Sequence, residues 1–417
     1  MRLLLVAWGS RGDVAPLVAL GRGLGAAGHE VTVAAADGFA GLVEGAGLRY
    51  RRFAISLDAT TADPVVLRWL AGSDSLPAEL RNMRAAARRF APVLAEGLAA
   101  MVGEADALVS GLLSLDALAP WARRHGRPLV AALLQPMLPT RWASALTHSV
   151  VPGRSVANLA AGWYQAAGMY SLLRRPLRQA HAALGVPHHG LRGYLRTVTT
   201  TPTLVGASPL VVPRPADWPA HARVCGYWPE PTRPGYRPPP DLAGFLAAGP
   251  PPVYLGFGSM PSADVAGLRS TVLAAAGATG TRAVLGGVLH AGPAPVEQLG
   301  DDVVSVAGLP HAWLFPRTAG VVCHGGAGTV GAALRAGVPV GVVAHMGDQH
   351  YWGRRVHELG AGPPPLHRSR LTTGRLAALL GGLTVPSARR TAAGLGAALQ
   401  AEDGVASAVA FLEEALG

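Results

Sequence analysis

The sequence has 417 residues, half of them hydrophobic and only 15% charged, and its 36 basic and 25 acidic side chains give a formal net charge of +11. All the basic residues are arginine, and the absence of lysine excludes Schiff-base enzymes, P-loop nucleotide hydrolases and Ser-x-x-Lys acyl enzymes. The length and the large apolar fraction predict two globular domains of roughly 200 residues each.

The first 36 residues have the pattern of a strand, a helix and a second strand. We expect a buried strand at Arg2–Trp8, a tight loop at Gly9–Asp13, a helix at Leu17–Ala27 and a strand at Val31–Ala35. Such a unit predicts a parallel sheet. The first apolar run is too short for the core of a secretory signal, and two cysteines are too few for a disulfide framework, so we expect a cytoplasmic protein.

Further strands are expected at Ala107–Ser110 and Leu129–Leu133, with long helical stretches between and after them. One stretch, residues 155–173, contains no formal charge, but Asn158, Gln165 and its amphipathic spacing argue against a membrane-spanning helix. We expect a core or ligand-lining helix there, with at most peripheral membrane contact. The arginines are scattered and are not interleaved with aromatic residues, so no nucleic acid partner is expected.

A proline-rich segment then separates the two halves of the chain. Prolines are densest at Pro229–Pro240, a composition typical of a linker. We therefore predict an N-terminal domain over 1–228, a linker over 229–252 and a C-terminal domain over 253–417. A second series of strands is expected in the C-terminal domain, at Val253–Phe257, Arg282–Leu285, Val303–Val306, Gly320–Cys323 and Val338–Val343. In parallel α/β domains, ligands bind at the carboxyl ends of the strands.

A glycine-rich turn, HGGAGT at residues 324–329, connects the strand Gly320–Cys323 to a helix expected at Val330–Ala336. Glycine allows a ligand to approach the backbone closely, and the N–H groups and the dipole of a helix start favour an anion. His324 and Thr329 could each donate a hydrogen bond to a phosphoryl oxygen. The turn therefore predicts a diphosphate site, although such turns can also serve only to pack a helix on a sheet.

Together with this turn, four segments resemble the GT-B nucleotide-sugar glycosyltransferases. They are GSRGDV at 9–14, GFGSM at 256–260, GLPHAWLFPR at 308–317 and GDQHYWGRRV at 347–356. The chain most resembles the sterol glucosyltransferase branch, and next the actinomycete enzymes that glycosylate antibiotic aglycones. The resemblance is strong over 253–366 and thin over 37–240. It implies an α/β fold of two Rossmann-like domains whose parallel sheets face a central cleft, with the last helix packing back on the N-terminal domain.

The resemblance also implies a role for each motif residue. It assigns the donor diphosphate to the glycine-rich turn and to the loop after the first strand of the C-terminal domain, at Ser259, His324, Gly325, Gly326, Gly328 and Thr329. It assigns the nucleobase to the segment containing Leu309, His311 and Trp313. Asp348 and Gln349 would bind sugar hydroxyls, although Asp348 could instead be a plain helix N-cap.

Asp13 is the predicted general base. It follows the first strand and so lies at the carboxyl edge of the sheet, and no histidine occurs between residues 1 and 28. Inverting glycosyl transfer needs a base that takes the proton of the acceptor hydroxyl. The ordinary aspartate pKa of about 4 is low for this task, so burial would have to raise it. Asp13 could instead only cap the helix that we expect to begin near Pro16.

Departures from the family pattern leave the donor open. Ala332 stands where plant members have a glutamate that holds the ribose, so UDP and dTDP both remain possible, and His350 and Tyr351 replace residues of sterol-type relatives near the sugar. No Asp-x-Asp motif occurs, so neither a metal nor another cofactor is expected. Bulky apolar residues in the N-terminal half favour an apolar hydroxylated acceptor such as a polyketide, a macrolide or a sterol-like lipid.

Alternative functions on the same fold are a cell-wall or glycolipid glycosyltransferase and a nucleotide-sugar epimerase. A non-catalytic protein that binds a nucleotide sugar is a further alternative.

Overall fold

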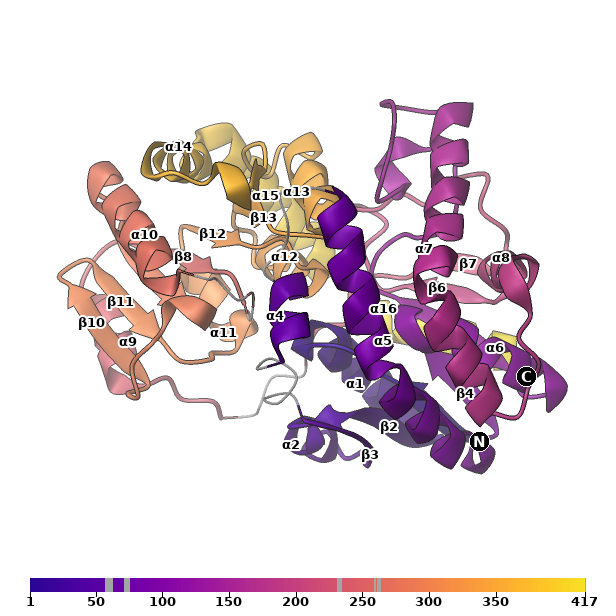
Figure 1. The fold of residues 1–417 in the computed structure, drawn as a ribbon. Helices are drawn as coiled ribbons and strands as arrows, with labels where there is room; N and C mark the ends of the chain where they lie inside the picture. Colours follow the sequence, from indigo (N-terminus) through magenta and orange to yellow (C-terminus); the bar gives the residue numbers. More distant parts are fainter. Residues whose placement is uncertain (57–62, 71–75, 231–234, 259, 261–263, 417) are drawn as a thin grey trace. The chain divides into compact units, whose positions relative to one another are not determined.

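The computed structural model describes residues 1–56, 63–70, 76–230, 235–258, 260 and 264–416. The chain divides into two compact α/β units (Figure 1). Of the described residues, unit 1 contains 1–56, 63–69, 76–230 and 402–416, and unit 2 contains 235–258, 260 and 264–401, together with Leu70. The chain therefore passes from unit 1 to unit 2 and returns to unit 1 near its C-terminal end.

Unit 1 is built on a parallel sheet with the strand order β3-β2-β1-β4-β5-β6-β7. The strands are β1 (Arg2–Val6), β2 (Glu30–Asp37), β3 (Arg49–Ser56), β4 (Ala107–Ser110), β5 (Leu129–Leu133), β6 (Thr203–Val205) and β7 (Ala222–Val224). After Arg2 every residue of β1 is buried, as expected for a strand covered on both faces by helices.

Two layers of helices cover this sheet, because successive strand residues point to opposite faces. Leu3 and Leu5 belong to the core shared with α1 and α16, whereas Leu4 and Val6 belong to the core shared with α5 to α8. The helices of unit 1 are α1 (Arg11–Ala26), α2 (Ala40–Glu44), α4 (Pro64–Leu70), α5 (Leu76–Met101), α6 (Leu112–Arg124), α7 (Val156–Ala183), α8 (Gly190–Thr200) and α16 (Gly404–Leu416). Figure 1 shows α5 and α7 side by side.

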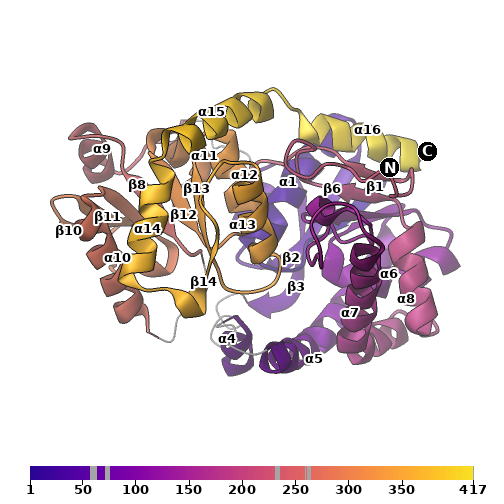
Figure 2. The same ribbon diagram turned by 90° about the horizontal axis from the view of Figure 1, so that it is seen from above.

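Helix α16 packs on α1, so residues far apart in sequence complete one core (Figure 2). Gly23 of α1 provides the room, because a Cβ there would lie 2.4 Å from Cγ1 of Val405. The Trp228 indole also donates a hydrogen bond of 3.2 Å to the carbonyl oxygen of Gly404.

Unit 2 has a second seven-stranded sheet, with the order β10-β11-β9-β8-β12-β13-β14. Its strands are β8 (Val253–Gly256), β9 (Ala283–Gly286), β10 (Val296–Gly300), β11 (Val303–Val306), β12 (Gly320–Cys323), β13 (Val340–Ala344) and β14 (Leu366–His367), of which β10 is antiparallel to its neighbour. Its helices are α9 (Pro240–Ala247), α10 (Val265–Thr279), α11 (His311–Leu314), α12 (Ala327–Arg335), α13 (Gln349–Glu358), α14 (Thr373–Leu383) and α15 (Pro386–Gln400). The chain order reverses between β8 and β12, and ligands of open α/β sheets bind at such a point.

Three expectations about individual elements differ from the structure. Helix α1 begins at Arg11 and not at Leu17, so most of the expected loop Gly9–Asp13 is helical. Helix α12 begins at Ala327 and not at Val330. The segment 229–252, expected to be linker, contains helix α9, whose Pro240 suits a first helical position. Within the described part of the chain, no helix is long and apolar enough to cross a bilayer.

Candidate donor and acceptor sites

The turn between β12 and α12 can form only with glycine at its centre. Gly325 has a φ of +93°, and a Cβ there would lie 2.7 Å from Cγ1 of Val342 and 2.8 Å from the carbonyl oxygen of Gln349. Gly326 is the N-cap of α12 and has no side chain to cap the helix. The N–H groups of Ala327, Gly328 and Thr329 are therefore the first of α12, where no intrahelical acceptor exists, and they are available to an anion.

The ring of His324 lies between this turn and the loop after β8. A Cβ on Gly258 would be 3.1 Å from Cε1 of His324, and a Cβ on Gly326 would be 2.5 Å from its Nε2, so both glycines make room for the ring. Its Nδ1 is buried and has no hydrogen-bond partner among the described residues. Burial, helped by the nearby His311, lowers the pKa of His324 to about 4. The imidazole is therefore neutral at pH 7.

The two predicted sugar-binding residues stand at the start of α13. Asp348 occupies the N-cap position, but its Oδ2 accepts a hydrogen bond of 2.8 Å from the indole of the buried Trp352, and its side chain makes no capping bond to the helix backbone. Gln349 is buried, and its Oε1 accepts hydrogen bonds from the backbone N–H groups of His345 and Met346, at 2.7 and 3.0 Å. Its amide therefore holds the β13–α13 loop beside the glycine-rich turn.

The predicted nucleobase segment belongs to α11, which packs against α12. His311 stacks on Phe315, with 4.4 Å between ring centroids. The guanidinium carbon of Arg317 lies over the Trp313 ring, 4.5 Å from its centroid. Leu309 is half-buried immediately before this helix. Both aromatic rings thus already have protein partners. Ser259, which was predicted to bind the donor diphosphate, lies outside the described residues.

Asp13 is in the first turn of α1, where its carboxylate completes a capping arrangement. Its Oδ2 accepts hydrogen bonds from the backbone N and the Oγ of Ser10, at 2.8 and 3.0 Å. A Cβ on Gly9, whose φ is +143°, would lie 2.3 Å from Oδ2. Although the residue is exposed, desolvation of its carboxylate raises the pKa of Asp13 above the ordinary value of 3.8, and the Ser10 hydrogen bonds oppose this. Oδ1 has no hydrogen-bond partner among the described residues and could accept a proton.

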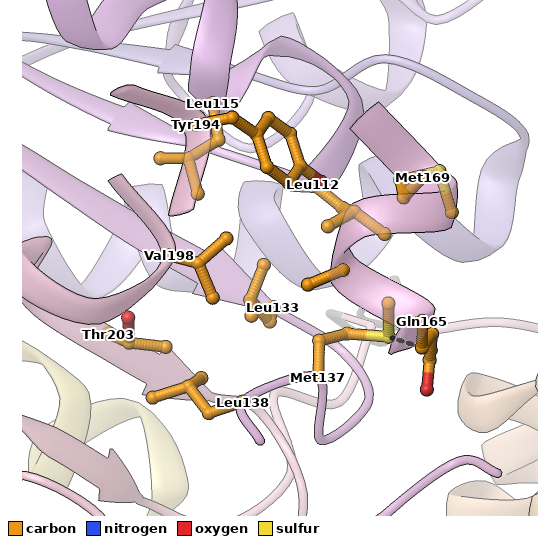
Figure 3. Close-up of a pocket in the computed structure, with 11 residues that line it drawn as sticks. Leu112, Leu115, Leu133, Met137, Leu138, Gln165, Met169, Tyr194, Val198 and Thr203 are labelled. Carbon is orange, nitrogen blue, oxygen red and sulfur yellow. Dashed lines mark hydrogen bonds between the residues drawn. The ribbon is translucent and has the colours of Figure 1, made fainter. Parts of the chain in front are cut away.

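Unit 1 also contains a small apolar cavity of about 40 Å³ between β5 and helices α6, α7 and α8 (Figure 3). Apolar side chains make up most of its wall, and Gln165 and Thr203 are its polar members. The Gln165 amide donates a hydrogen bond of 2.8 Å to the hydroxyl of Thr147. In Figure 3 Met169 and Tyr194 lie at the upper side of the cavity and Met137 below them. The wall suits an apolar group, but the space is too small for a large one.

Comparisons with known proteins decide the family. Residues 3–119 match the N-terminal domain of glycosyltransferase family 28, and residues 271–409 match the C-terminal domain of erythromycin biosynthesis protein CIII-like proteins. The chain is 32% identical over 423 residues to O-mycaminosyltylonolide 6-deoxyallosyltransferase of Streptomyces fradiae, covering 99% of the chain and 97% of that relative. The chain belongs to the GT-B glycosyltransferases.

Other relatives of this glycosyltransferase support the assignment. It is 28% identical to the sterol 3-beta-glucosyltransferase UGT80B1 of Arabidopsis thaliana, over 98% of the chain and 67% of that relative. The calicheamicin glycosyltransferase CalG4 has the same fold, with a TM-score of 0.70 at 21% identity over 100% of this chain and 98% of that one. SsfS6 of Streptomyces sp. SF2575, solved with thymidine diphosphate, has a TM-score of 0.64 at 21% identity, over 99% of this chain and 99% of that one. The predicted GT-B fold is confirmed.

Sequence reasoning missed His345, which directly follows β13 at the same edge of the sheet as His324. Its ring centroid is 5.7 Å from that of Phe257, and its Nδ1 is buried with no hydrogen-bond partner among the described residues. Burial, with nearby Arg368, His324 and His367, lowers the pKa of His345 to about 3. Its position at the end of a predicted strand was a signal that could have identified it.

A hydrogen-bonded chain of side chains in unit 1 was also missed. The Asp116 carbonyl oxygen can only accept, so His181 donates to it from Nε2, at 3.0 Å, and accepts at Nδ1 from Nδ1 of His188, also at 3.0 Å. His188 then accepts at Nε2 from the Tyr170 hydroxyl, at 3.1 Å. The Asp116 carboxylate contacts Nε2 of His189, at 3.0 Å. No local pattern joins residues so far apart in sequence.

Proposed function

We propose that this enzyme transfers a sugar from a UDP- or dTDP-sugar to a hydroxyl of an apolar acceptor, with inversion at the anomeric carbon and without a metal or other cofactor. The observation that carries the proposal is the start of α12, where Ala327, Gly328 and Thr329 offer backbone N–H groups beside the neutral His324. These donors and the helix dipole stabilise the charge that develops on a departing diphosphate. They replace the lysine and the metal-binding Asp-x-Asp motif that the sequence lacks.

Asp13 supplies the other half of the proposed reaction. Its carboxylate takes the proton of the acceptor hydroxyl while that oxygen attacks the anomeric carbon, and the bond between this carbon and the diphosphate oxygen breaks. Attack opposite the leaving group inverts the configuration. The raised pKa of Asp13 makes it a stronger base than an ordinary aspartate, and the Ser10 hydrogen bonds orient it.

The donor and acceptor classes follow from separate observations. Ala332 offers no carboxylate to a ribose hydroxyl, so the proposal includes dTDP-sugars, and SsfS6, a structural neighbour, is solved with thymidine diphosphate. The apolar wall of the small cavity in unit 1 suits an apolar group of an acceptor, and the S. fradiae and A. thaliana relatives are named for a tylonolide and for sterols. Cys225 and Cys323 are both unpaired, which supports a reducing cytoplasm as the location.

The test is to incubate the protein with UDP-glucose or dTDP-glucose, a panel of macrolide and sterol alcohols, and EDTA, and to identify products by mass spectrometry and NMR. We expect an acceptor glycoside of inverted configuration whose formation EDTA does not prevent. Conversion of the nucleotide sugar without an acceptor would indicate an epimerase. Absence of both transfer and nucleotide binding would contradict the proposal, as would a product of retained configuration.

Thermal unfolding separates the donors. A nucleotide that binds only the native state raises the melting temperature by mass action, so UDP and dTDP can be ranked without knowing the acceptor.

A further inference from the structure

The net charge of the chain comes from one continuous segment. Residues 117–216 contain 11 arginines and no aspartate or glutamate, and the other 317 residues contain 25 arginines and 25 acidic residues. The formal charge of +11 therefore equals the charge of this segment alone. It runs from α6 through β5, α7 and α8 to the loop after β6, all within unit 1.

Nine of these 11 arginines are exposed to solvent, and Arg127 and Arg141 are half-buried. Within the described part of the chain, Arg127 is the only one of the 11 that forms an ion pair, with Asp106 at 3.7 Å. Six exposed ones lie on or beside α7 and α8, which pack against each other: Arg154, Arg174, Arg175, Arg178, Arg192 and Arg196. Figure 1 shows these two helices in the same outer layer of unit 1. We call the outer surface of α7 and α8, together with the loop before α7, the basic face.

The same face carries exposed apolar side chains. Tyr164 is 82% exposed, Val156 is 65% exposed and Val150 is 64% exposed. The outward positions of α7 follow helical spacing, and they change from small and apolar residues near its start to arginines near its end: Ala157, Ala160, Tyr164, Ser171, Arg175 and Arg178. A helix surface that pairs apolar and aromatic side chains with arginines, without acidic residues, has the composition of an interfacial helix.

The loop before α7, which presents Val150, is held by a buried side chain of the helix. Asn158 is fully buried, and its Oδ1 accepts hydrogen bonds from the backbone N–H groups of Val150 and Val151, at 2.9 and 3.1 Å. Its Nδ2 lies within hydrogen-bond distance of three carbonyl oxygens, those of Arg141, Val151 and Gly153. Val150 is therefore exposed on an ordered loop and Val156 and Tyr164 on a regular helix, and a partner surface would explain why these apolar side chains face water.

We propose that the basic face of unit 1 docks on the surface of an anionic lipid bilayer. Its arginines would attract lipid phosphates, and Tyr164, Val156 and Val150 would enter the boundary between headgroups and acyl chains. Aliphatic valines do not stack on nucleobases, which favours a lipid over a nucleic acid. The opposite side of α7 contributes Gln165, Ala166 and Met169 to the apolar cavity, so docking would place that cavity close to lipid.

The experiment is co-sedimentation of the full chain with phosphatidylcholine vesicles, with and without phosphatidylglycerol. We expect binding only to the anionic vesicles and its loss at high salt, because screening weakens attraction between exposed charges. The triple variant Arg174→Ala, Arg175→Ala, Arg178→Ala should bind at least tenfold more weakly. The double variant Val156→Ser, Tyr164→Ser should lose the part of the binding that resists salt.

The matched control is Arg389→Ala, Arg390→Ala, which removes two exposed arginines from α15 of unit 2 and should leave vesicle binding unchanged. Unchanged melting temperatures would show that the variants fold. Three results would overturn the proposal: no binding to anionic vesicles, equal binding by the triple variant and the wild type, or tighter binding to a single-stranded oligonucleotide than to vesicles. The measurement uses no nucleotide sugar, so its outcome is independent of the proposed transferase reaction.

Discussion

The candidate sites in the two units of this glycosyltransferase differ in the groups that form them, mainly backbone groups in unit 2 and mainly side chains in unit 1. In unit 2 the turn between β12 and α12 is mainly backbone, and glycines at 325 and 326 bring N–H groups and a buried imidazole together. In unit 1 the side chains of His181 and His188, from α7 and the loop before α8, form one hydrogen-bonded chain with the backbone carbonyl oxygen of Asp116 in α6. The backbone site has no room for a Cβ at Gly325 or Gly326, whereas a side-chain network depends on every donor and acceptor in it.

This difference explains which site can be recognised in a sequence. Six adjacent residues, HGGAGT, contain nearly all of the turn, so its chemistry can be inferred from their types alone. The network of unit 1 joins residues separated by up to 73 positions, and each histidine considered alone would be taken for an ordinary core residue. Five experiments test the comparison.

Asp13→Asn tests whether unit 1 contributes a reacting group. Asparagine can still accept the Ser10 hydrogen bonds, so folding and nucleotide binding should survive, whereas transfer should fall by roughly 10²–10⁴-fold. In the wild type the rate should fall as the pH drops through the raised pKa of Asp13, because only the carboxylate can take the proton. Calorimetry with UDP and dTDP and a pH–rate profile are the measurements. Glu44→Gln, an exposed acid of α2, is the control, and near-normal turnover of Asp13→Asn would exclude Asp13 as the base.

Gly325→Ala tests the backbone site. A side chain at a φ of +93°, with its Cβ 2.7 Å from Val342 and 2.8 Å from the Gln349 carbonyl, should destabilise the protein by roughly 2–4 kcal/mol. Gly328→Ala is the matched control, because a Cβ there meets no atom within 4 Å and alanine favours the helix by about 1 kcal/mol. Urea unfolding measures both variants.

The same control variant tests the predicted diphosphate contact. If the diphosphate approaches the start of α12, Gly328→Ala should be more stable than the wild type and yet bind UDP or dTDP more weakly. Unchanged nucleotide affinity would contradict a close approach at this position.

Acidification tests the two buried histidines of unit 2. The folded-state pKa values of His324 and His345, about 4 and about 3, lie below the ordinary 6.5, so the unfolded state binds their protons more readily. The contribution of the two histidines to the free energy of unfolding is complete above pH 6.5. It is lost as the pH falls toward 4, at up to about 1.4 kcal/mol per pH unit for each histidine. Chemical unfolding at pH 7 and pH 4.5 measures this loss. His324→Gln should lose about 3 kcal/mol less than the wild type, and an equal loss would argue against a buried neutral imidazole.

Tyr170→Phe tests the side-chain network. It removes the hydroxyl that donates to His188, leaving Nε2 of that ring without its donor, and should cost about 1 kcal/mol at neutral pH. Tyr164→Phe is the control, because that hydroxyl belongs to a side chain that is 82% exposed. Equal urea midpoints for the two variants would show that the network contributes nothing to stability.

Much of the fold could be predicted because buried parallel strands are continuous apolar runs, as β1, β8 and β12 are. Helix starts could not be located as well. Helix α1 begins at Arg11 because Ser10 and Asp13 form a capping arrangement, and α12 begins at Ala327 because the glycines before it end the strand directly. Strands β3, β6, β7, β10 and β14 were not predicted, and β10 carries Glu297 and Gln298 at the edge of its sheet. The sequence shows the type of each polar side chain in the candidate site but not the direction in which it points. Asp348 is an example, because its carboxylate accepts a hydrogen bond from the Trp352 indole.

The position of α16 has a consequence for the order in which the molecule is made. Unit 1 shares a core with residues 404–416, whereas residues 235–401 of unit 2 form their sheet without help from the residues that follow. A ribosome therefore releases every strand of the second sheet before it releases the helix that closes the core over α1. Until α16 is synthesised, the surface of α1 around Gly23 lacks the side chains that cover it in the folded protein, so the core of nascent unit 1 is incomplete.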